Sequence, residues 1–434
     1  MIETSFTLPC GLILPNRIVK AAMTEKFSDV DGHATPRHAC LFERLAEGGA
    51  GMLITGNVVI DPRYLEAPGN VFIEDDSGLD ALKRWAAAGK SRGVRMIMQL
   101  NHAGRQTPAS VSPVSIAPSA VPLNLGTFFS VPRAMSDVEI EEVIGRFAFA
   151  ASLAEKAGFD GVEIHAAHGY LISQFLSPRI NKRNDMWGGS IANRARLLVR
   201  VVEAVRGAVS DGFAVGIKLN VGDFIKGGLE PEDSIAVARM LDPLGVDFIE
   251  LSGGTHERAV SFGFGDAPEG PRSEAYFLSY ARDIRSVTRV PLILTGGMRS
   301  AQVMRDVLQA RHCDLIGMAR PLVIEPDLPR LLLRGALREA RSFSLKLPAS
   351  PRANLLELLW SREQLIRIAD GKAPKLNASP KLSLYRMLWD ELGFRRRRAR
   401  FVARFPVQPS SIFVALANGL RKPRPDQGAA RPAA

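Results

Sequence analysis

Cysteine is scarce in this chain, with only Cys10, Cys40 and Cys313 among its 434 residues. The three lie far apart and form no C-x-x-C pair, which argues against a disulfide framework, a zinc site or an iron–sulfur cluster. A chain that depends on no disulfide suits a reducing compartment, so we expect a cytoplasmic protein.

Long apolar runs are missing as well. No apolar stretch reaches the roughly 18 residues that a membrane-spanning helix requires. The first residues, which include Glu3 and Thr4, lack the basic flank and apolar run of an export signal. The sequence therefore predicts neither a membrane span nor an export signal.

An excess of positive charge is confined to one end of the chain. The formal net charge is +11, but residues 1–340 hold 37 Lys and Arg against 39 Asp and Glu, whereas residues 341–434 hold 19 against 6. A nearly neutral body is not that of a nucleic-acid-binding protein, so no nucleic-acid partner is expected. The run from Arg395 to Arg398 is interpreted as part of a solvated tail, with docking on anionic lipid or nucleic acid as the alternative.

What the chain does have is a regular alternation of two kinds of segment. Short runs rich in Val, Ile, Leu and Met recur about eight times, each followed by a longer stretch with helical spacing. The predicted strands lie near residues 18–22, 51–55, 94–100, 160–165, 214–219, 247–252, 291–295 and 314–318, and predicted helices near 137–157, 192–209, 230–242 and 300–310. Ser136 with Glu139 three residues later is a helix start signal.

This alternation predicts an α/β fold, a single TIM (βα)8 barrel over residues 1–340. Residues 341–434 are expected to form a basic C-terminal extension, partly helical, with a disordered end. An open doubly wound sheet is the alternative fold, but no G-x-G-x-x-G follows the first strand.

Two long segments interrupt the alternation. The segment from Gln106 to Pro132 is too long for an ordinary connection, and such excursions on a barrel usually cap a site. The segment from Gly253 to Arg272 is rich in glycine and proline. It is either a mobile lid or a plain surface loop, and the sequence leaves both open.

Polar residues occur near the ends of three apolar strands. Because strand side chains alternate between faces, Glu163 and His165 share one face, and Gln99 and Lys218 occupy the matching face of their own strands. We expect this face to point into the barrel, so these residues converge on one rim. A lone buried Lys or Gln at a strand end could instead be a core residue with satisfied hydrogen bonds. Buried polar groups cost roughly 1–3 kcal/mol unless they find partners, and three of them on one rim favour a ligand there.

Two late turns carry the signs of a phosphate site. Gly296 and Gly297 follow the seventh predicted strand, and Ala319 and Arg320 follow the eighth. Barrels commonly bind phosphate there through backbone N–H groups, and an arginine adds a charged contact. A glycine pair alone is more often plain turn chemistry.

The most specific motif is the segment from Gly158 to Arg196. A buried strand leads into a turn that bears His165, His168 and Tyr170, and then into Gln-Phe-Leu-Ser-Pro and Gly-Gly-Ser. The segment resembles the flavin-dependent ene-reductases of the Old Yellow Enzyme family. The resemblance covers roughly residues 5 to 340 and extends to Leu-Pro-Asn-Arg-Ile at 14–18 and Gln-Leu-Asn-His-Ala-Gly-Arg at 99–105.

The resemblance implies FMN bound across the mouth of the barrel. Gln99 matches the glutamine at the pyrimidine edge of the flavin, and Lys218 matches the basic residue beside N1 and O2, where a cation stabilises the charge that develops on reduction. The residues implied to contact the cofactor are Ala22, Met23, Thr24, Gly56, Gln99, Lys218, Gly296, Gly297, Ala319 and Arg320. Ala22 replaces the proline usual in the family, and Thr24 supplies a hydroxyl near O4.

The resemblance also assigns the reacting groups. His165 and His168 would donate hydrogen bonds to a carbonyl or nitro oxygen of the substrate, and Tyr170 would protonate the α-carbon after hydride transfer to the β-carbon. It therefore implies an FMN-dependent enzyme that uses NADH or NADPH to reduce electron-poor C=C bonds of a small molecule.

Several alternatives stay open. Within the flavoprotein barrels they are an oxidative demethylase and a dienoyl-thioester reductase, and outside them a binding role for the basic tail. The two histidines could instead be structural residues of a turn. They could also form a metal pair, but His102 and His256 stand in separate segments and no ligand set is evident, so no metal is expected. A homo-oligomer is compatible with the sequence.

Overall fold

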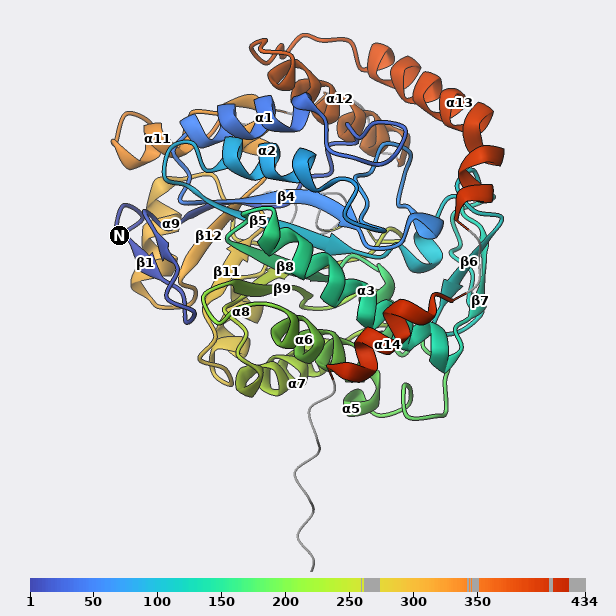
Figure 1. Cartoon of the computed structure of the whole chain (residues 1–434). Helices are drawn as coiled ribbons and strands as arrows, with labels where there is room; N and C mark the ends of the chain where they lie inside the picture. The colour runs from blue at the N-terminus through green and yellow to red at the C-terminus, as the bar shows by residue number, and fades with distance from the viewer. Residues whose placement is uncertain are drawn as a thin grey trace, which may run out of the picture.

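A closed barrel of eight parallel strands forms the centre of the computed structural model (Figure 1). The structure describes residues 1–258, 260, 274–341, 343, 345, 351–405 and 409–420. In order around the barrel the strands are β3 (Ile18–Lys20), β4 (Met52–Val59), β5 (Arg95–Asn101), β8 (Gly161–Ala166), β9 (Ala214–Asn220), β10 (Phe248–Ser252), β11 (Leu292–Thr295) and β12 (Leu315–Met318). The predicted barrel and all eight predicted strands are confirmed, and the open sheet is excluded.

Helices surround the barrel (Figure 1). They are α1 (Pro36–Glu47), α2 (Leu79–Gly89), α3 (Asp137–Lys156), α4 (Leu171–Leu176), α5 (Ile191–Arg194), α6 (Arg196–Ala208), α7 (Pro231–Leu241), α8 (Leu278–Arg285), α9 (Ala301–Gln309), α10 (Arg320–Ile324) and α11 (Leu328–Leu333), with short 3-10 turns at η1 (Pro62–Tyr64), η2 (Gly104–Gln106) and η3 (Asp242–Leu244). The predicted capping box at Ser136 and Glu139 starts α3. The predicted helix at 192–209 is divided into α5 and α6 at Ala195.

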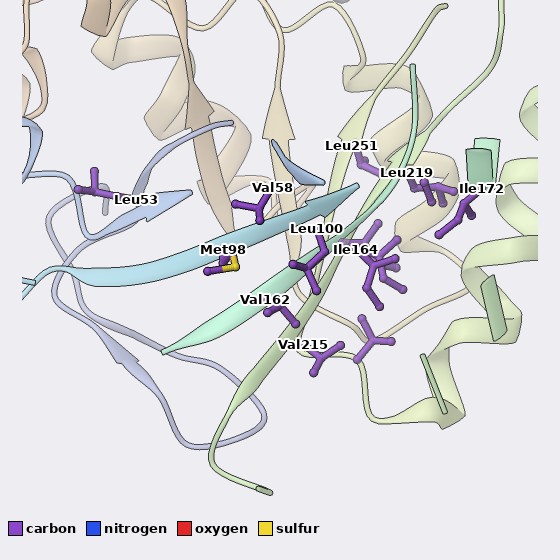
Figure 2. Packing of buried hydrophobic residues seen from close by; sticks show 14 of the residues in the cluster. Leu53, Val58, Met98, Leu100, Val162, Ile164, Ile172, Val215, Leu219 and Leu251 are labelled. Atoms are coloured by element: carbon purple, nitrogen blue, oxygen red, sulfur yellow. The ribbon is translucent and has the colours of Figure 1, made fainter. Parts of the chain in front are cut away.

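The outward faces of the strands hold the helices in place. Val162 and Ile164 of β8 pack with Met98 and Leu100 of β5 in a layer of apolar side chains between strands and helices (Figure 2). These strands are buried on both faces, as expected when helices cover a parallel sheet. The side chains on the inward faces of the strands do not take part in this packing and point into the barrel.

The amino-terminal end of the barrel is closed by a hairpin that the sequence analysis missed. Strands β1 (Phe6–Thr7) and β2 (Ile13–Leu14) pair antiparallel. Leu8 and Leu14 pack into the barrel interior against a cluster that includes Ile97 and Phe248. Two-residue strands give too short an alternation to be recognised in a sequence.

The predicted excursion from Gln106 to Pro132 has structure of its own. It contains β6 (Val114–Ala117), which pairs in parallel with β7 (Val131–Ala134). The other long segment, from Gly253 to Arg272, lies mostly outside the described residues, so the choice between lid and surface loop is not tested.

The C-terminal extension packs on the barrel. Its helices are α12 (Pro351–Ala369), α13 (Pro380–Arg404) and α14 (Ser411–Gly419). Helix α14 lies on α3, where the backbone of Phe413 sits so close to Gly145 that an added Cβ would clash. Helix α12 lies beside α1, and Arg37 of α1 forms an ion pair with Asp370 just after α12.

The predicted disordered end falls within residues 421–434, which are outside the described residues. Among the helices that the structure describes, none is both long and apolar enough to cross a membrane.

Candidate active site

The mouth of the barrel holds a layer of buried, paired polar side chains. Gln99 Nε2 donates to Glu163 Oε2 at 2.6 Å, and Lys218 forms an ion pair with Glu250. Thr295 Oγ1 donates to the same Glu250 oxygen at 2.7 Å. Gln99 and Lys218 therefore lie on the inner face as predicted, as does Glu163, and the layer joins strands β5, β8, β9, β10 and β11.

The two carboxyl groups of this layer carry different charges. Burial raises the pKa of Glu163 well above its usual value, and the neighbouring charge of Glu250 raises it further. Burial also opposes ionisation of Glu250, but the ammonium of Lys218 and the hydrogen bonds from its neighbours lower the pKa of Glu250 overall. Of the two acids, Glu250 therefore forms the ion pair, and Glu163 is the one whose protonated form is favoured.

His165, His168 and Tyr170 gather on the same rim. The ring of His165 lies 5.0 Å from that of His168 and 4.8 Å from that of Tyr170, measured between centroids. His165 ends β8, and its Cα pairs with that of Lys218 on β9. The three predicted catalytic residues are thus adjacent and lie directly beside the paired polar layer.

An unusual backbone conformation aims His168 at this rim. Its φ is +61°, a left-handed value that is uncommon for residues other than glycine. The N–H of His168 donates to Asn220 Oδ1 at 3.0 Å, and its Nε2 lies 2.7 Å from Ser252 Oγ. Contacts from β9 and β10 therefore stabilise a strained turn, which is common at functional sites.

Both imidazoles are neutral. Burial lowers the pKa of His165 and that of His168 well below 6.5, and the positive charge of Lys218 lowers both further. The N–H of Ala167 donates to His165 Nδ1 at 3.2 Å, so the proton of the neutral ring lies on Nε2. Nε2 of His165 is then a donor that can bind an oxygen atom.

Tyr170 keeps its proton over the whole neutral range. Burial raises the pKa of its phenol well above 10, and the nearby carboxylate of Glu66 raises it further. The ring of His256 lies 5.6 Å from that of Tyr170. A protonated phenol beside two neutral imidazoles gives a site with three hydrogen-bond donors.

The segment after β3 lies against β4. Asn57 Nδ2 donates to Thr24 Oγ1 at 3.1 Å, and the N–H of Gly56 donates to Glu25 Oε1 at 2.8 Å. Gly56 lies inside β4 and not in a turn, at the point where its pairing with β5 shifts register. A Cβ there would lie 2.0 Å from Glu25 Oε2, so only glycine lets the segment with Ala22, Met23 and Thr24 approach the strand.

The predicted phosphate turns line a cavity of about 140 Å³ at the carboxyl ends of β11 and β12. Gly296 and Gly297, both with positive φ, form one wall together with Ala319 and Arg320. The guanidinium of Arg320 lies 4.0 Å from Glu357 of α12. Other residues that line the cavity include Arg299, Arg341, Phe343 and Trp360.

The C-terminal extension thus reaches the site, which the sequence analysis did not predict. Trp360 stacks on Phe343 at 4.1 Å between ring centroids and closes one side of the cavity. Arg362 Nη2 donates to the carbonyl of Lys26 at 3.2 Å and to Asp390 of α13 at 3.0 Å. Lys26 has a φ of +60°, so α12 stabilises a strained residue just beyond Thr24.

Comparison with known proteins identifies the family. Residues 11–337 match the NADH:flavin oxidoreductase / NADH oxidase family. The chain belongs to this family.

Its relatives include the NADH-dependent flavin oxidoreductase iccE of Talaromyces variabilis, 40% identical over 76% of this chain and 86% of the relative. The NADH-dependent flavin oxidoreductase iliE of Neonectria sp. is also 40% identical, but the chain spans only 46% of its length. Among solved structures, the Old Yellow Enzyme homologue of Zymomonas mobilis superposes with a TM-score of 0.68 at 28% identity, over 81% of this chain and 98% of the other. Family membership confirms the predicted cofactors, FMN with NADH or NADPH.

The residues at the mouth fit FMN. The cavity beside Gly296 and Arg320 offers backbone N–H groups and cationic side chains to a phosphate. Both amide atoms of Asn101, two residues beyond Gln99 on the same face of β5, are buried with no hydrogen-bond partner in the described part of the chain. A polar ring over the mouth would give them partners.

Sequence reasoning missed Glu250, the acid that pairs with Lys218. Its signal was available, since Glu250 interrupts the apolar strand Phe-Ile-Glu-Leu-Ser and shares a face with Phe248 and Ser252. His102 and Arg105 hold the neighbouring segment: His102 Nδ1 accepts from the N–H of Gly104, and Arg105 pairs with Glu257. No group of three or more His, Cys, Asp or Glu side chains that could hold a metal ion occurs among the residues described.

Proposed function

We propose that this chain is an FMN-dependent NAD(P)H oxidoreductase that reduces electron-poor C=C bonds, such as those of enones and nitroalkenes. The observation that carries the proposal is the cluster of His165, His168 and Tyr170 on one rim, with all three groups in their neutral, proton-donating forms. Such a cluster suits a substrate that needs an oxygen polarised and a carbon protonated.

Each residue has a distinct part in the proposed reaction. His165 Nε2–H and the imidazole of His168 bind the carbonyl or nitro oxygen and draw electron density from the β-carbon. FMN, which Gln99 and Lys218 would hold at the mouth of the barrel, would supply the hydride for that carbon. Tyr170 gives its proton to the α-carbon, which is basic enough to take it from a phenol, and recovers a proton from solvent.

The buried layer beneath the rim supports these donors. The pair formed by Lys218 and Glu250 places a fixed cation beside the proposed flavin position. Gln99 donates from its amide nitrogen to Glu163, and in this proposal its amide oxygen accepts a hydrogen bond from the flavin. We further propose that Ala22, Met23, Thr24 and Gly56 contact the flavin, and that Gly296, Gly297, Ala319 and Arg320 bind its phosphate.

We propose the boundary between the FMN-binding barrel and the C-terminal extension near residue 340. Helix α12 nevertheless contributes Trp360 and Glu357 to the cavity at the proposed phosphate site. The extension therefore completes the cofactor pocket in this proposal, although it follows the barrel in the sequence.

Anaerobic half-reactions test the function. The purified flavoprotein is reduced with NADH or NADPH and then mixed with a cyclic enone, a nitroalkene or a saturated ketone, and flavin absorbance is followed. We expect reoxidation by the two alkenes and none by the saturated ketone. Reduction of the oxidised enzyme by an N-methylated amine, with no response to the alkenes, would favour the demethylase alternative.

The variant Tyr170→Phe separates the proton donor from the rest of the site. We expect alkene turnover to fall about 10²- to 10⁴-fold, the usual contribution of a general acid, while flavin reduction by nicotinamide is unchanged. Tyr64→Phe, which removes a buried phenol from η1, is the matched control and should leave both half-reactions intact. Equal loss of both half-reactions in Tyr170→Phe would reject this role for Tyr170.

A further inference from the structure

Helix α13 presents large apolar side chains to solvent. Leu382, Tyr385, Leu388, Trp389 and Leu392 are between 46% and 74% exposed. Their spacing of three and four residues places them on one face of the helix. Isolated exposed apolar residues are ordinary, but a contiguous stripe on one helix marks an interaction surface. We call these five residues the α13 stripe.

The opposite face of α13 accounts for its packing on the protein. Ser383 and Phe394 are buried, and Phe394 joins Phe405 in a cluster with Val59 and Phe72. Helix α13 lies at the periphery of the molecule, beyond α12 (Figure 1). Folding of the chain therefore does not require the α13 stripe, which faces away from the packed side.

The charge of α13 is strongly positive. Residues 380–404 contain eight Lys and Arg and two Asp and Glu. Lys381, at the start of the helix, and Arg396 and Arg397, directly beyond the α13 stripe, are exposed. The stripe is therefore flanked by cations at both ends.

We propose that α13 docks on an anionic lipid bilayer, with the α13 stripe inserted at the level of the headgroups. A helix with Trp, Tyr and Leu on one face and Arg and Lys around it has the features of an interfacial helix. Anionic lipid attracts the cations, and the aromatic rings suit the boundary between headgroups and acyl chains.

Charge argues against a second copy of the chain as the occupant of this surface. Two α13 helices that met through their stripes would bring two helices of net charge +6 together, whereas an anionic bilayer offers charge of the opposite sign. Phe401 of α13 packs on Phe72, which bridges to Val59 at the end of β4, so the packed face of α13 lies near the mouth end of the barrel. Docking would therefore bring this edge of the mouth close to the lipid.

The tryptophans of the chain give a direct readout. Of the four, Trp85, Trp187 and Trp360 are at most 2% exposed, whereas Trp389 is 74% exposed. Full-length protein is mixed with vesicles of phosphatidylcholine alone or of phosphatidylcholine with phosphatidylserine, then sedimented, and its tryptophan emission is recorded. We expect binding to the anionic vesicles, weakened by salt, with a blue shift of emission and protection from a soluble quencher.

The double variant Tyr385→Ser with Trp389→Ser should lower anionic vesicle affinity, measured by sedimentation, at least tenfold, with NADH oxidation unchanged. Ile412→Ser, on α14, removes a side chain of similar exposure and should bind as the wild type does. Equal binding of the double variant, or no vesicle binding by the wild type, would overturn the proposal. So would a finding that the double variant converts a dimer to a monomer without any lipid binding by the wild type.

Discussion

The two ends of the barrel interior differ although the same strands build them. At the amino-terminal end, Ile97 and Phe248 pack with Leu8 and Leu14 in an apolar cluster. Two residues further along the same strands, about 6.5 Å at the usual rise per residue, come Gln99 and Glu250, which belong to the polar layer. Inward-facing residues of the same strand therefore have different roles. Those at the amino-terminal end, which the hairpin closes, contribute to stability, and those at the open mouth contribute to chemistry.

The largest expected effect comes from the closed end. Phe248 lies so close to Gly216 that an added Cβ would meet its ring at 2.0 Å, so the two residues fill one space. Phe248→Ala should lower the free energy of unfolding by about 3–5 kcal/mol because it leaves a cavity. Denaturant unfolding measures this, and the flavin spectrum of the folded fraction should be unchanged.

Phe128→Ala is the control, since it removes an exposed phenylalanine and should change stability by no more than about 0.5 kcal/mol. A Phe248→Ala protein of normal stability with altered flavin binding would contradict the division between the two ends.

The sequence predicted only part of this difference between the two ends of the barrel. Alternation along β5, β8 and β9 correctly placed Gln99, Glu163 and Lys218 on the inner face, because side-chain direction in a strand follows from position alone. The hairpin of β1 and β2 was missed because two-residue strands carry too little pattern. Glu250 could be recognised as a polar residue on the inner face of its strand, but its pairing with Lys218 could not be predicted, because it depends on the register between β9 and β10, which places the two residues opposite each other.

The contribution of α12 was hidden for a related reason. Trp360 and Arg362 reach the mouth through tertiary contacts with the cavity and with the carbonyl of Lys26. The sequence pattern of their segment predicts an ordinary amphipathic helix, and such a pattern does not indicate the surface against which the helix packs. For this reason the sequence suggested an appendage where the structure has part of the site.

A smaller effect is expected when the charge at the open end is altered. Glu250→Gln keeps the shape of the side chain but removes the carboxylate that pairs with Lys218, so the free energy of unfolding should fall by about 1.5–3 kcal/mol. The cation is then no longer neutralised, and the flavin midpoint potential should become more positive because a nearby positive charge favours the reduced, anionic state.

Glu163→Gln is the matched control. Since burial and the charge of Glu250 raise the pKa of Glu163 and favour its protonated form, its replacement by the neutral amide should change stability and potential less than Glu250→Gln does. If the two variants exchanged their behaviour, the ionised acid of the layer would be Glu163 and the charge assignment would be wrong.

The smallest expected effect is on the pH dependence of the free energy of unfolding, and it should come from a residue at the open end of the barrel. The folded-state pKa of His168 is lowered, first by burial and then by Lys218, whereas the unfolded chain takes up a proton near pH 6.5. Stability from this group is therefore complete above pH 6.5 and is lost as pH falls below it, by about 1.4 kcal/mol between roughly pH 7.5 and pH 5.5. His168→Asn should remove that part of the decline, measured as urea unfolding at both pH values.

A comparison with His38 separates the pH effect from chemistry. His38 lies in the first turn of α1, where its ring packs against Phe27 and Trp85, and burial lowers its pKa to about 3. His38→Asn should reduce the loss of stability at low pH by a similar amount yet leave alkene turnover intact, whereas His168→Asn should also slow that turnover.

Phe248→Ala, in contrast, should lower stability equally at both pH values, because its cluster contains no group that titrates in this range. A decline that His168→Asn left unchanged would mean that this imidazole accepts a proton in the folded protein, and the neutral donor proposed for substrate binding would then be lost near pH 6.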